Sequence, residues 1–134
     1  MTTRGITYAQ FAKMALAYPG VEAGPSFGTP GLKVKGKFMA RLREPDVLVL
    51  KPVYDDEQRF LMDTQPEAFF LTDHYRGGWP GILVRLSKVD RGQLAELLEQ
   101  AWRRLAPKRL LAAYDGGGPT PAAAGASTKR RVRA

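Results

Sequence analysis

The sequence predicts an α+β fold in a single domain, and three observations lead to this prediction. Residues 31–51 alternate apolar and charged side chains in the manner of short strands joined by tight turns. Apolar residues recur at helical spacing in residues 8–18 and again in residues 94–105. The 134 residues are 44% hydrophobic and 25% charged, an ordinary globular composition at the size of one domain.

The first helix is expected in residues 8–18, because Thr7 and Gln10 have the spacing of a capping box. Its apolar stripe predicts one buried face. Pro19 and Gly20 are expected to end it, since proline cannot continue a helix and glycine favours the conformation that follows one.

A loop is expected next, because residues 21–30 are rich in glycine and proline. At most a brief strand is expected there, near residues 26–27. The strands of residues 31–51 follow. The run Val47–Leu50 is apolar on both faces, so it is expected to be a central strand whose second side is also partly covered.

The first turn of this three-stranded unit is predicted from side-chain parity. A three-residue loop, Lys35-Gly36-Lys37, pairs Val34 with Phe38 and Leu32 with Ala40. A two-residue loop would set apolar side chains opposite charged ones, because a slip of one residue exchanges the two faces of a strand. Gly36 supplies the backbone freedom that such a turn needs.

The second turn follows from the same reasoning, which predicts the loop Glu44-Pro45-Asp46 with Leu42 opposite Leu48. The sheet is then covered on one face and open to water on the other. The covered face is expected to hold Leu32, Val34, Phe38, Ala40 and Leu42, and the open face Lys33, Arg41 and Arg43.

A short second helix is expected to begin at Asp55, since acidic side chains favour a helix N-terminus. Phe60 and Leu61 are expected to face the core. Residues 68–71 and 81–86 then have the pattern of two further strands, which brings the sheet to about five strands.

The segment between these two strands, residues 72–80, combines His74, Tyr75, Arg76 and Trp79 with flexible glycines. Two interpretations stay open. The segment is either an exposed turn whose aromatic rings stack on a ligand, or a loop whose Trp79 folds back on the core.

The last clear helix begins after Asp90 as its cap and ends at Pro107, with another turn or two in residues 108–114. Residues 1–114 are therefore predicted to form the domain. Residues 115–134 are of low complexity and are expected to be a disordered basic tail. Its terminal cluster could grasp phosphates or aid solubility, and consists of Lys129, Arg130, Arg131 and Arg133.

Several classes of protein are excluded or disfavoured by composition. Without cysteine there are no disulfides, thiolate zinc sites or cysteine nucleophile. No apolar run approaches the ~20 residues of a membrane span and no signal-peptide core is present, so a cytoplasmic protein without membrane association is expected. His74 is the one histidine, and no nucleophile or acid–base pattern accompanies it. We expect no enzymatic activity, metal or cofactor.

The most informative feature is the predicted hairpin tip that carries Lys35 and Lys37, with Lys33 close by, which suggests a basic prong. The net charge of +8 is a second functional signal. Residues 115–134 contribute +3 of it, which leaves +5 on the predicted domain. A basic fold favours polyanions, above all nucleic acid, through counterion release. Solubility alone is the plainer interpretation of the same charge.

Six segments, taken in order, resemble successive motifs of the MmcQ/YjbR-like family. The resemblance covers roughly residues 7–114 and omits the tail. The segments are residues 16–22 (LAYPGVE), 28–30 (GTP), 34–40 (VKGKFMA), 69–75 (FFLTDHY), 79–86 (WPGILVRL) and 102–110 (WRRLAPKRL).

This resemblance implies a two-layer fold similar to secretion chaperones, with an antiparallel sheet backed by helices. It also implies DNA binding, because members of the family are commonly described as DNA-binding through paired hairpin wings. Carried over to this chain, the wing is Lys33, Lys35, Gly36 and Lys37. Residues 74–79 match a second family motif, although Gly-Trp-Pro-Gly at residues 78–81 departs from the usual Gly-Tyr-Pro-Trp.

We therefore expect a protein that binds double-stranded DNA through its phosphates with little sequence preference, as a monomer or weak homodimer. A protein-interaction or chaperone-like module that uses an apolar patch at Val47 and Val49 is the alternative. A small-molecule site near Glu22, His74 and Trp79 is a third hypothesis. The expected phosphate ligands are Lys33, Lys35, Lys37, Arg41, Arg43, Arg76, Arg85, Lys88 and the terminal cluster.

Overall fold

The computed structural model describes residues 4–26, 28–75 and 77–115. The predicted tail from residue 116 onward and Arg76 lie outside this part. The elements are α1 (Tyr8–Leu16), β1 (Val21–Ser26), β2 (Thr29–Val34), β3 (Lys37–Glu44), β4 (Val47–Leu50), α2 (Asp55–Thr64), β5 (Phe69–Phe70), the 3-10 turn η1 (Asp73–Tyr75), β6 (Ile82–Arg85), α3 (Arg91–Leu105) and α4 (Lys108–Asp115).

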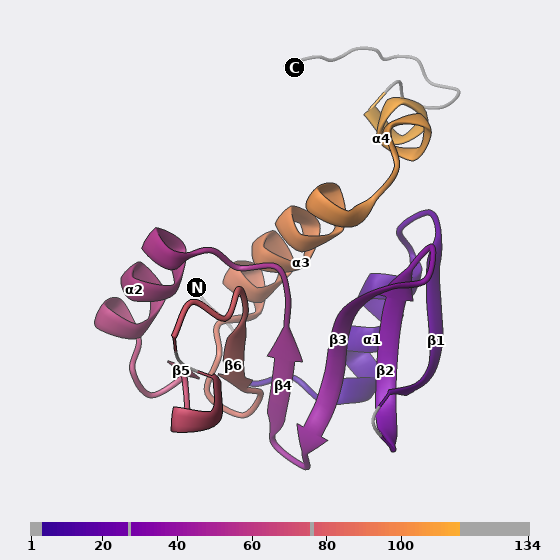
Figure 1. The fold of residues 1–134 in the computed structure, drawn as a ribbon. Helices are drawn as coiled ribbons and strands as arrows, with labels where there is room; N and C mark the ends of the chain where they lie inside the picture. The colour runs from indigo at the N-terminus through magenta and orange to yellow at the C-terminus, as the bar shows by residue number, and fades with distance from the viewer. Residues whose placement is uncertain (1–3, 27, 76, 116–134) are drawn as a thin grey trace.

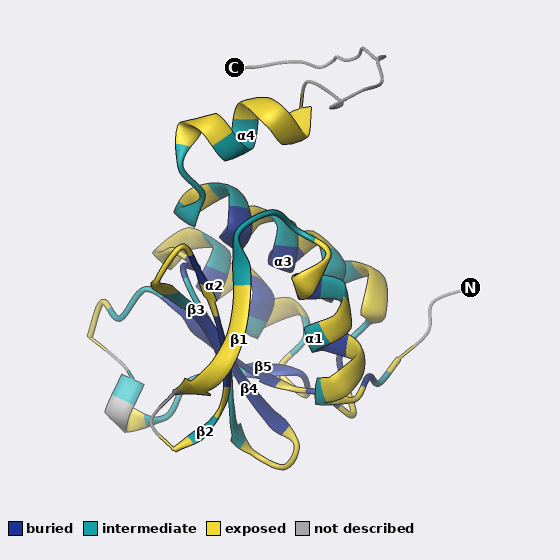
Figure 2. Ribbon diagram, turned by 90° about the vertical axis from the view of Figure 1, so that its right-hand side faces the viewer, coloured by how far each residue is buried: buried dark blue, intermediate teal, exposed yellow. Residues whose placement is uncertain are grey.

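The fold is α+β, as predicted, with the described strands in one antiparallel sheet ordered β1-β2-β3-β4-β6-β5 (Figure 1). Figure 2 shows α1 and α3 on one side of this sheet. The main core lies on the helical side and includes Phe11 of α1, Leu61 of α2 and Trp102 of α3. Trp102 is fully buried, and its Nε1 donates to the carbonyl oxygen of Pro19 at 2.8 Å. None of the helices in the described ranges is long and apolar enough to span a bilayer.

The predicted loop of residues 21–30 is wrong, because this stretch forms β1 and the start of β2. The two strands pair in register from Val21 opposite Val34 to Ser26 opposite Thr29. β1 lies at one edge of the sheet, where among the described strands it pairs with β2 alone, and Pro25 is tolerated at such an edge. The described sheet therefore has six strands rather than about five.

The first turn also differs from the prediction. It has two residues, Lys35 and Gly36, with Val34 directly opposite Lys37. Both turn residues have positive φ, 48° and 85°. Such a turn matches the right-handed twist of the strands that it joins, which is why two-residue hairpins favour it.

A β-bulge explains why only one of the two predicted residue pairs of this hairpin is found in the structure. Leu32 still lies opposite Ala40, as predicted, but Lys33 pairs with Phe38, so Met39 is the extra residue. Met39 is buried in the main core, whereas Phe38 packs on the opposite face of the sheet. The expectation that Phe38 lies in the helix-covered core is therefore wrong.

The second turn repeats this outcome. Leu42 lies opposite Leu48, as predicted, but Glu44 pairs with Val47, so the loop has two residues rather than three. A second bulge, at Arg43, absorbs the difference.

The helix caps are confirmed. Thr7 and Gln10 form the reciprocal capping box, and Asp90 accepts from the backbone N–H of Gln93 at 2.8 Å. One helical prediction is wrong: Leu61 is buried, but Phe60 is 60% exposed. Neighbouring residues on an α-helix point about 100° apart, so a single apolar stripe has room for only one of this pair.

Candidate nucleic-acid interface

Three lysines gather at the β2–β3 turn and are called the tip lysines: Lys33 of β2, Lys35 of the turn and Lys37 of β3. All three side chains are exposed. Among residues 4–26, 28–75 and 77–115, no carboxylate lies within ion-pair distance of any of them. Glu22 faces Lys33 across the β1–β2 ladder without forming an ion pair. The predicted wing is thus displayed to solvent.

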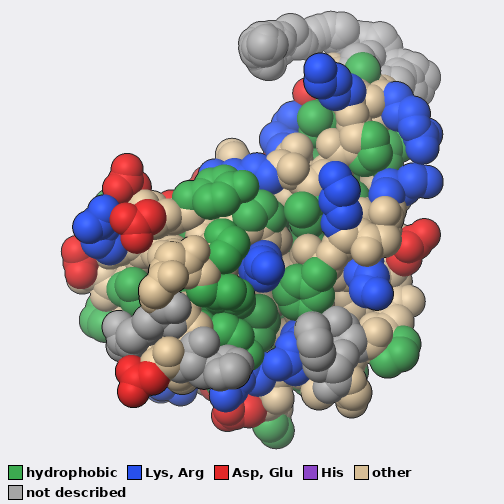
Figure 3. Space-filling model, in the orientation of Figure 1, with side chains coloured by type: hydrophobic (Ala, Val, Ile, Leu, Met, Phe, Trp, Pro, Cys, Tyr) green, Lys and Arg blue, Asp and Glu red, His purple; other side chains and the backbone are tan. Residues whose placement is uncertain are grey.

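Helix α4 adds two cations that the sequence analysis did not assign to this surface, Lys108 and Arg109. A Cβ placed on Gly20 would lie 2.7 Å from Leu110 Cδ1 and 3.1 Å from Lys35 Cδ, so the start of α4 and the stem of Lys35 flank the same glycine. Lys108 and Arg109 are exposed. Lys and Arg side chains gather over α4 and the upper end of the β2–β3 hairpin (Figure 3). The sequence signal was the basic pair directly after Pro107, but its nearness to the hairpin depends on tertiary packing.

The second face of the sheet, opposite the helices, carries an aromatic cover that we call the aromatic face. It consists of Phe38, Phe70, Tyr75 and Trp79, packed over the buried side chains Val47, Val49 and Leu83. The rings of Tyr75 and Trp79 lie 4.4 Å apart at 45°. Of the two interpretations of Trp79, the loop that folds back on the sheet is the correct one, and β4 is covered on both sides as predicted.

Two residues fix the loop that carries Trp79: Gln58 through hydrogen bonds, and Gly81 through the space that it leaves. Gln58 of α2 is the buried polar residue beneath it, and its Nε2 donates to the carbonyl oxygens of Trp79 and Gly81 at 2.6 and 2.7 Å. Gly81 leaves the space, because a Cβ there would lie 2.7 Å from the Trp79 ring and 2.9 Å from the Leu50 carbonyl oxygen. The Trp79 ring can pack in this position because residue 81 has no side chain.

The predicted arginine ligands lie on these rings rather than at the hairpin tip. Arg85 sits 4.2 Å above the centre of the Phe70 ring, and Arg43 lies 5.6 Å from that of Tyr75. Lys51 approaches Phe38 in the same manner at 5.9 Å. Arg43 also pairs with Glu44. Such cation–π contacts contribute about 0.5–2 kcal/mol each, which favours keeping these cations where they are.

Arg41 belongs to the same group. Its guanidinium donates to Thr29 Oγ1 at 3.2 Å and to the Tyr75 hydroxyl at 3.5 Å. Arg41, Arg43, Lys51 and Arg85 are called the ring-bound cations below. Lys33 stands opposite Phe38 in the β2–β3 ladder and so shares this face of the sheet with them. The two groups differ in their partners: the ring-bound cations contact rings or hydrogen-bond acceptors, whereas the tip lysines have no ion-pair partner among the described residues.

Lys88 lies still farther from the tip, in the turn after β6. The neighbouring N–H of Leu86 donates to Asp46 in the β3–β4 turn, which is the opposite end of β3 from Lys37. Arg4 donates to the Lys88 carbonyl oxygen at 3.2 Å and pairs with Glu67. Arg76, the side chain of His74 and the terminal cluster at residues 129–133 fall outside what the structure describes.

The structure also places the residues named in the two alternative hypotheses. Val47 and Val49 are only 5% and 2% exposed, so they form no open apolar patch for a partner. Glu22 stands on β1, and β2 and β3 lie between it and β4, which carries the Trp79 loop on its outer face. Across the described residues, no three acidic or histidine side chains are grouped in a way that could hold a metal ion.

Comparison with known proteins gives a family but no activity. The chain is 38% identical over 63 residues to an uncharacterised protein of Mycobacterium bovis and to uncharacterised proteins of two Mycobacterium tuberculosis strains. The match covers 46% of this chain and 48% of each relative, so the chain spans about half the length of the curated relatives that it matches. No solved structure matches it.

The family comparison covers a longer stretch. The YjbR family model matches residues 16–104, from the end of α1 to the last turn of α3, and so includes the β2–β3 hairpin and the aromatic face. Because the match extends over more than half of its length, the chain belongs to the YjbR family.

Proposed function

We propose that the protein binds double-stranded DNA without sequence preference, through the tip lysines together with Lys108 and Arg109. The observation that carries this proposal is the exposure of three lysines at one turn, with no ion-pair partner among the described residues. The net charge of +8 adds long-range attraction for a polyanion.

The hairpin geometry suits contacts with phosphates. A two-stranded ribbon fits the major groove of B-DNA, where lysines on both of its strands can reach phosphates on the groove walls. A lysine ammonium is a compact charge with rotatable donors, which neutralises a phosphate without demanding one geometry. Phosphate contacts fix position and carry no base sequence, so we expect similar affinity for duplexes of different sequence.

The ring-bound cations have a structural role in this proposal. Each would have to leave a ring or a hydrogen bond before it could meet a phosphate. We propose binding, because the described residues of this surface offer ammonium and guanidinium groups that suit an anion.

A duplex titration at several salt concentrations tests the proposal. The variant Lys35→Ala/Lys37→Ala should lower the slope of log K against log salt by about 1.8, at about 0.9 for each lost phosphate contact. The matched control is Lys13→Ala/Lys88→Ala, which removes the same charge from exposed sites on α1 and after β6. Its slope should stay at the wild-type value. Equal slopes for the two variants would contradict the proposal.

The terminal cluster needs its own variant. Replacing Lys129, Arg130, Arg131 and Arg133 by alanine in the full chain removes half of the net charge and leaves the hairpin intact. If this variant loses all duplex affinity, the tail rather than the hairpin makes the contacts, and the proposed role of the tip lysines is wrong.

A further inference from the structure

Charge is unevenly distributed over the molecule, although its total is +8. Helix α2 has four carboxylates and one arginine, a net charge of −3. In Figure 3 these acidic side chains gather on the side opposite α4. The carboxylates of α2 are Asp55, Asp56, Glu57 and Asp63.

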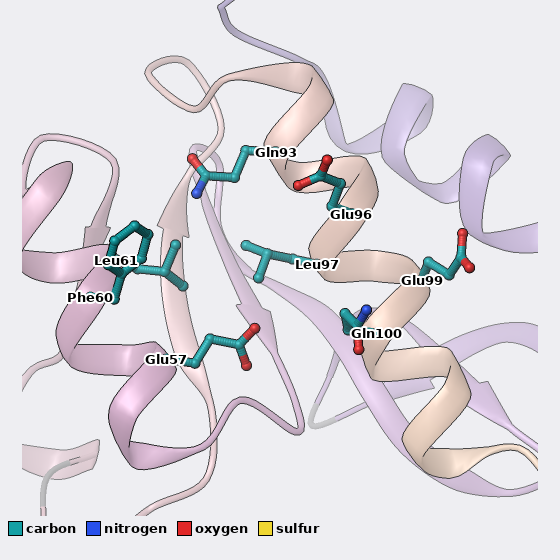
Figure 4. Close-up of a pocket in the computed structure, with 8 residues that line it drawn as sticks. All are labelled: Glu57, Phe60, Leu61, Gln93, Glu96, Leu97, Glu99 and Gln100. Atoms are coloured by element: carbon teal, nitrogen blue, oxygen red, sulfur yellow. The ribbon is translucent and has the colours of Figure 1, made fainter. Parts of the chain in front are cut away.

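A groove of about 520 Å³ runs between this acidic helix and α3. Figure 4 shows Leu61 and Leu97 pointing toward each other across it, and they are 2% and 6% exposed. Phe60 is also part of the lining and is 60% exposed, the most exposed of the large apolar side chains in the described part. The groove thus has an apolar floor and an exposed aromatic side chain.

The other lining residues are polar or acidic. Glu57 pairs with Arg104 at 3.0 Å, and Glu99 pairs with Arg103 at 2.9 Å. Glu96 is exposed and has no ion-pair partner within the described ranges. An apolar floor with an acidic rim suits a short basic segment that contains an apolar residue.

We propose that this groove binds the chain's own C-terminal segment, residues 129–133, which lies outside the described part. The segment reads Lys-Arg-Arg-Val-Arg and carries four positive charges around Val132. The arginines and lysine meet the rim carboxylates of Glu96 and Glu57, and Val132 packs against Phe60, Leu61 and Leu97.

The end of α4 lies close enough for this contact. Asp115, the last described residue, pairs with Arg103 at 2.8 Å, and Arg103 in turn holds Glu99 of the groove. The stretch of α3 from Arg103 back to Gln93 is about 15 Å long at 1.5 Å per residue. The 13 residues from 116 to 128 can span up to about 45 Å. Because the segment is tethered, its effective concentration is in the millimolar range, so weak intrinsic affinity suffices.

A spin label on the segment tests this inference in the full chain. The protein has no cysteine, so Ser127→Cys gives a single attachment site for a nitroxide. Amide signals of residues 57–61 and 93–100 should lose intensity while those of β1 keep it. Raising the salt to about 1 M, where the Debye length is about 3 Å, should restore them. Loss centred on the β2–β3 hairpin, or no localised loss, would overturn the proposal.

Two controls identify the occupant. Glu96→Lys should abolish the localised loss, whereas Glu22→Lys, the same change on β1 at the far edge of the sheet, should preserve it; equal effects of both would overturn the proposal. In a mixture of isotope-labelled chains without nitroxide and unlabelled chains with it, the labelled groove should keep its intensity. Loss in this mixture would assign the groove to the segment of a second copy and contradict an intramolecular contact.

Discussion

The tip lysines and the ring-bound cations differ in what lies beside them. Both groups come from the strands of one sheet and from residues directly beside them, Lys35 in the β2–β3 turn and Lys51 after β4. Lys35 lies beside Gly20 and the start of α4, and all three tip lysines are exposed without an ion-pair partner among the described residues, whereas the ring-bound cations lie against Phe38, Phe70 and Tyr75. A cation on a ring stabilises the fold, and a cation without a partner is available for an external anion. Counting basic residues on a face therefore overestimates a binding surface.

The aromatic face should be the stability-determining region, and Gln58 should show the largest effect. Gln58→Ala removes the donor from the carbonyl oxygens of Trp79 and Gly81. Each buried acceptor left without a donor costs about 1–3 kcal/mol, less where water enters. We expect a drop of that size in the free energy of unfolding by urea, with an unchanged salt slope for duplex binding. A reduced salt slope would show that the Trp79 loop contributes to binding.

Gly81→Ala should have the next largest effect. The new Cβ would meet the Trp79 ring at 2.7 Å and the Leu50 carbonyl oxygen at 2.9 Å, and the latter belongs to the backbone of a buried strand. Overpacking of this kind costs about 1–3 kcal/mol. Tryptophan fluorescence should shift to the red as Trp79 becomes hydrated. If the variant keeps the stability and the fluorescence emission of the wild type, the aromatic face can rearrange to admit the methyl group without loss of packing. Gly28→Ala is the matched control for the added methyl group, because the space there is open, although its positive φ adds its own strain.

A smaller effect is expected for Arg85→Ala, which removes the closest of the cation–π contacts. Arg85 is exposed, so we expect a loss of about 0.5–1 kcal/mol in unfolding free energy. Lys33→Ala, a change at an exposed tip lysine, should leave stability within about 0.5 kcal/mol. If Lys33→Ala destabilises the protein more than Arg85→Ala does, the contrast between the two groups fails.

The smallest effect concerns the docking of α4, which brings Lys108 and Arg109 to the tip. Burial, with Tyr114 and Glu99 nearby, raises the pKa of Tyr18 above its ordinary 10.0, and burial also raises the pKa of Tyr114. A raised folded-state pKa of this kind stabilises the fold below about pH 10 and loses that contribution as pH rises further. Stability should therefore fall above about pH 10. In the Tyr18→Phe variant the free energy of unfolding should fall less steeply above about pH 10. A fall as steep as in the wild type would contradict the assignment of this pH dependence to Tyr18.

Much of the fold could be predicted from the sequence because its signals are local. The capping box of Thr7, the cap of Asp90 and the doubly apolar run Val47–Leu50 all specify their structures through neighbouring residues. The misses come from long-range effects. β1 is rich in glycine and proline yet pairs with β2, and the bulge at Met39 moves Phe38 to the other face.

The candidate site could be predicted only in part for the same reason. The sequence correctly predicted a hairpin turn at Lys35 and Gly36, because such a turn is a local feature, although Lys37 begins β3 rather than lying in the turn. The rings that hold Arg41, Arg43 and Arg85 are contributed by β5 and the η1 turn, which are other elements than the strands β3 and β6 that carry these arginines. The contribution of Lys108 and Arg109 depends on where α4 docks beside Gly20. The alternation of apolar and charged residues along a strand predicts neither the ring partners of the arginines nor the position of α4.

One paired measurement tests the central claim most directly: duplex affinity against salt for Lys33→Ala/Lys35→Ala/Lys37→Ala and for Arg41→Ala/Arg43→Ala/Arg85→Ala. Each variant removes three positive charges, so a purely electrostatic attraction to the whole molecule would affect both equally. Our account predicts that the lysine variant lowers the salt slope by about 2.7 at wild-type stability. The arginine variant should keep the slope and lose stability. The reverse pattern, or equal losses of slope, would contradict it.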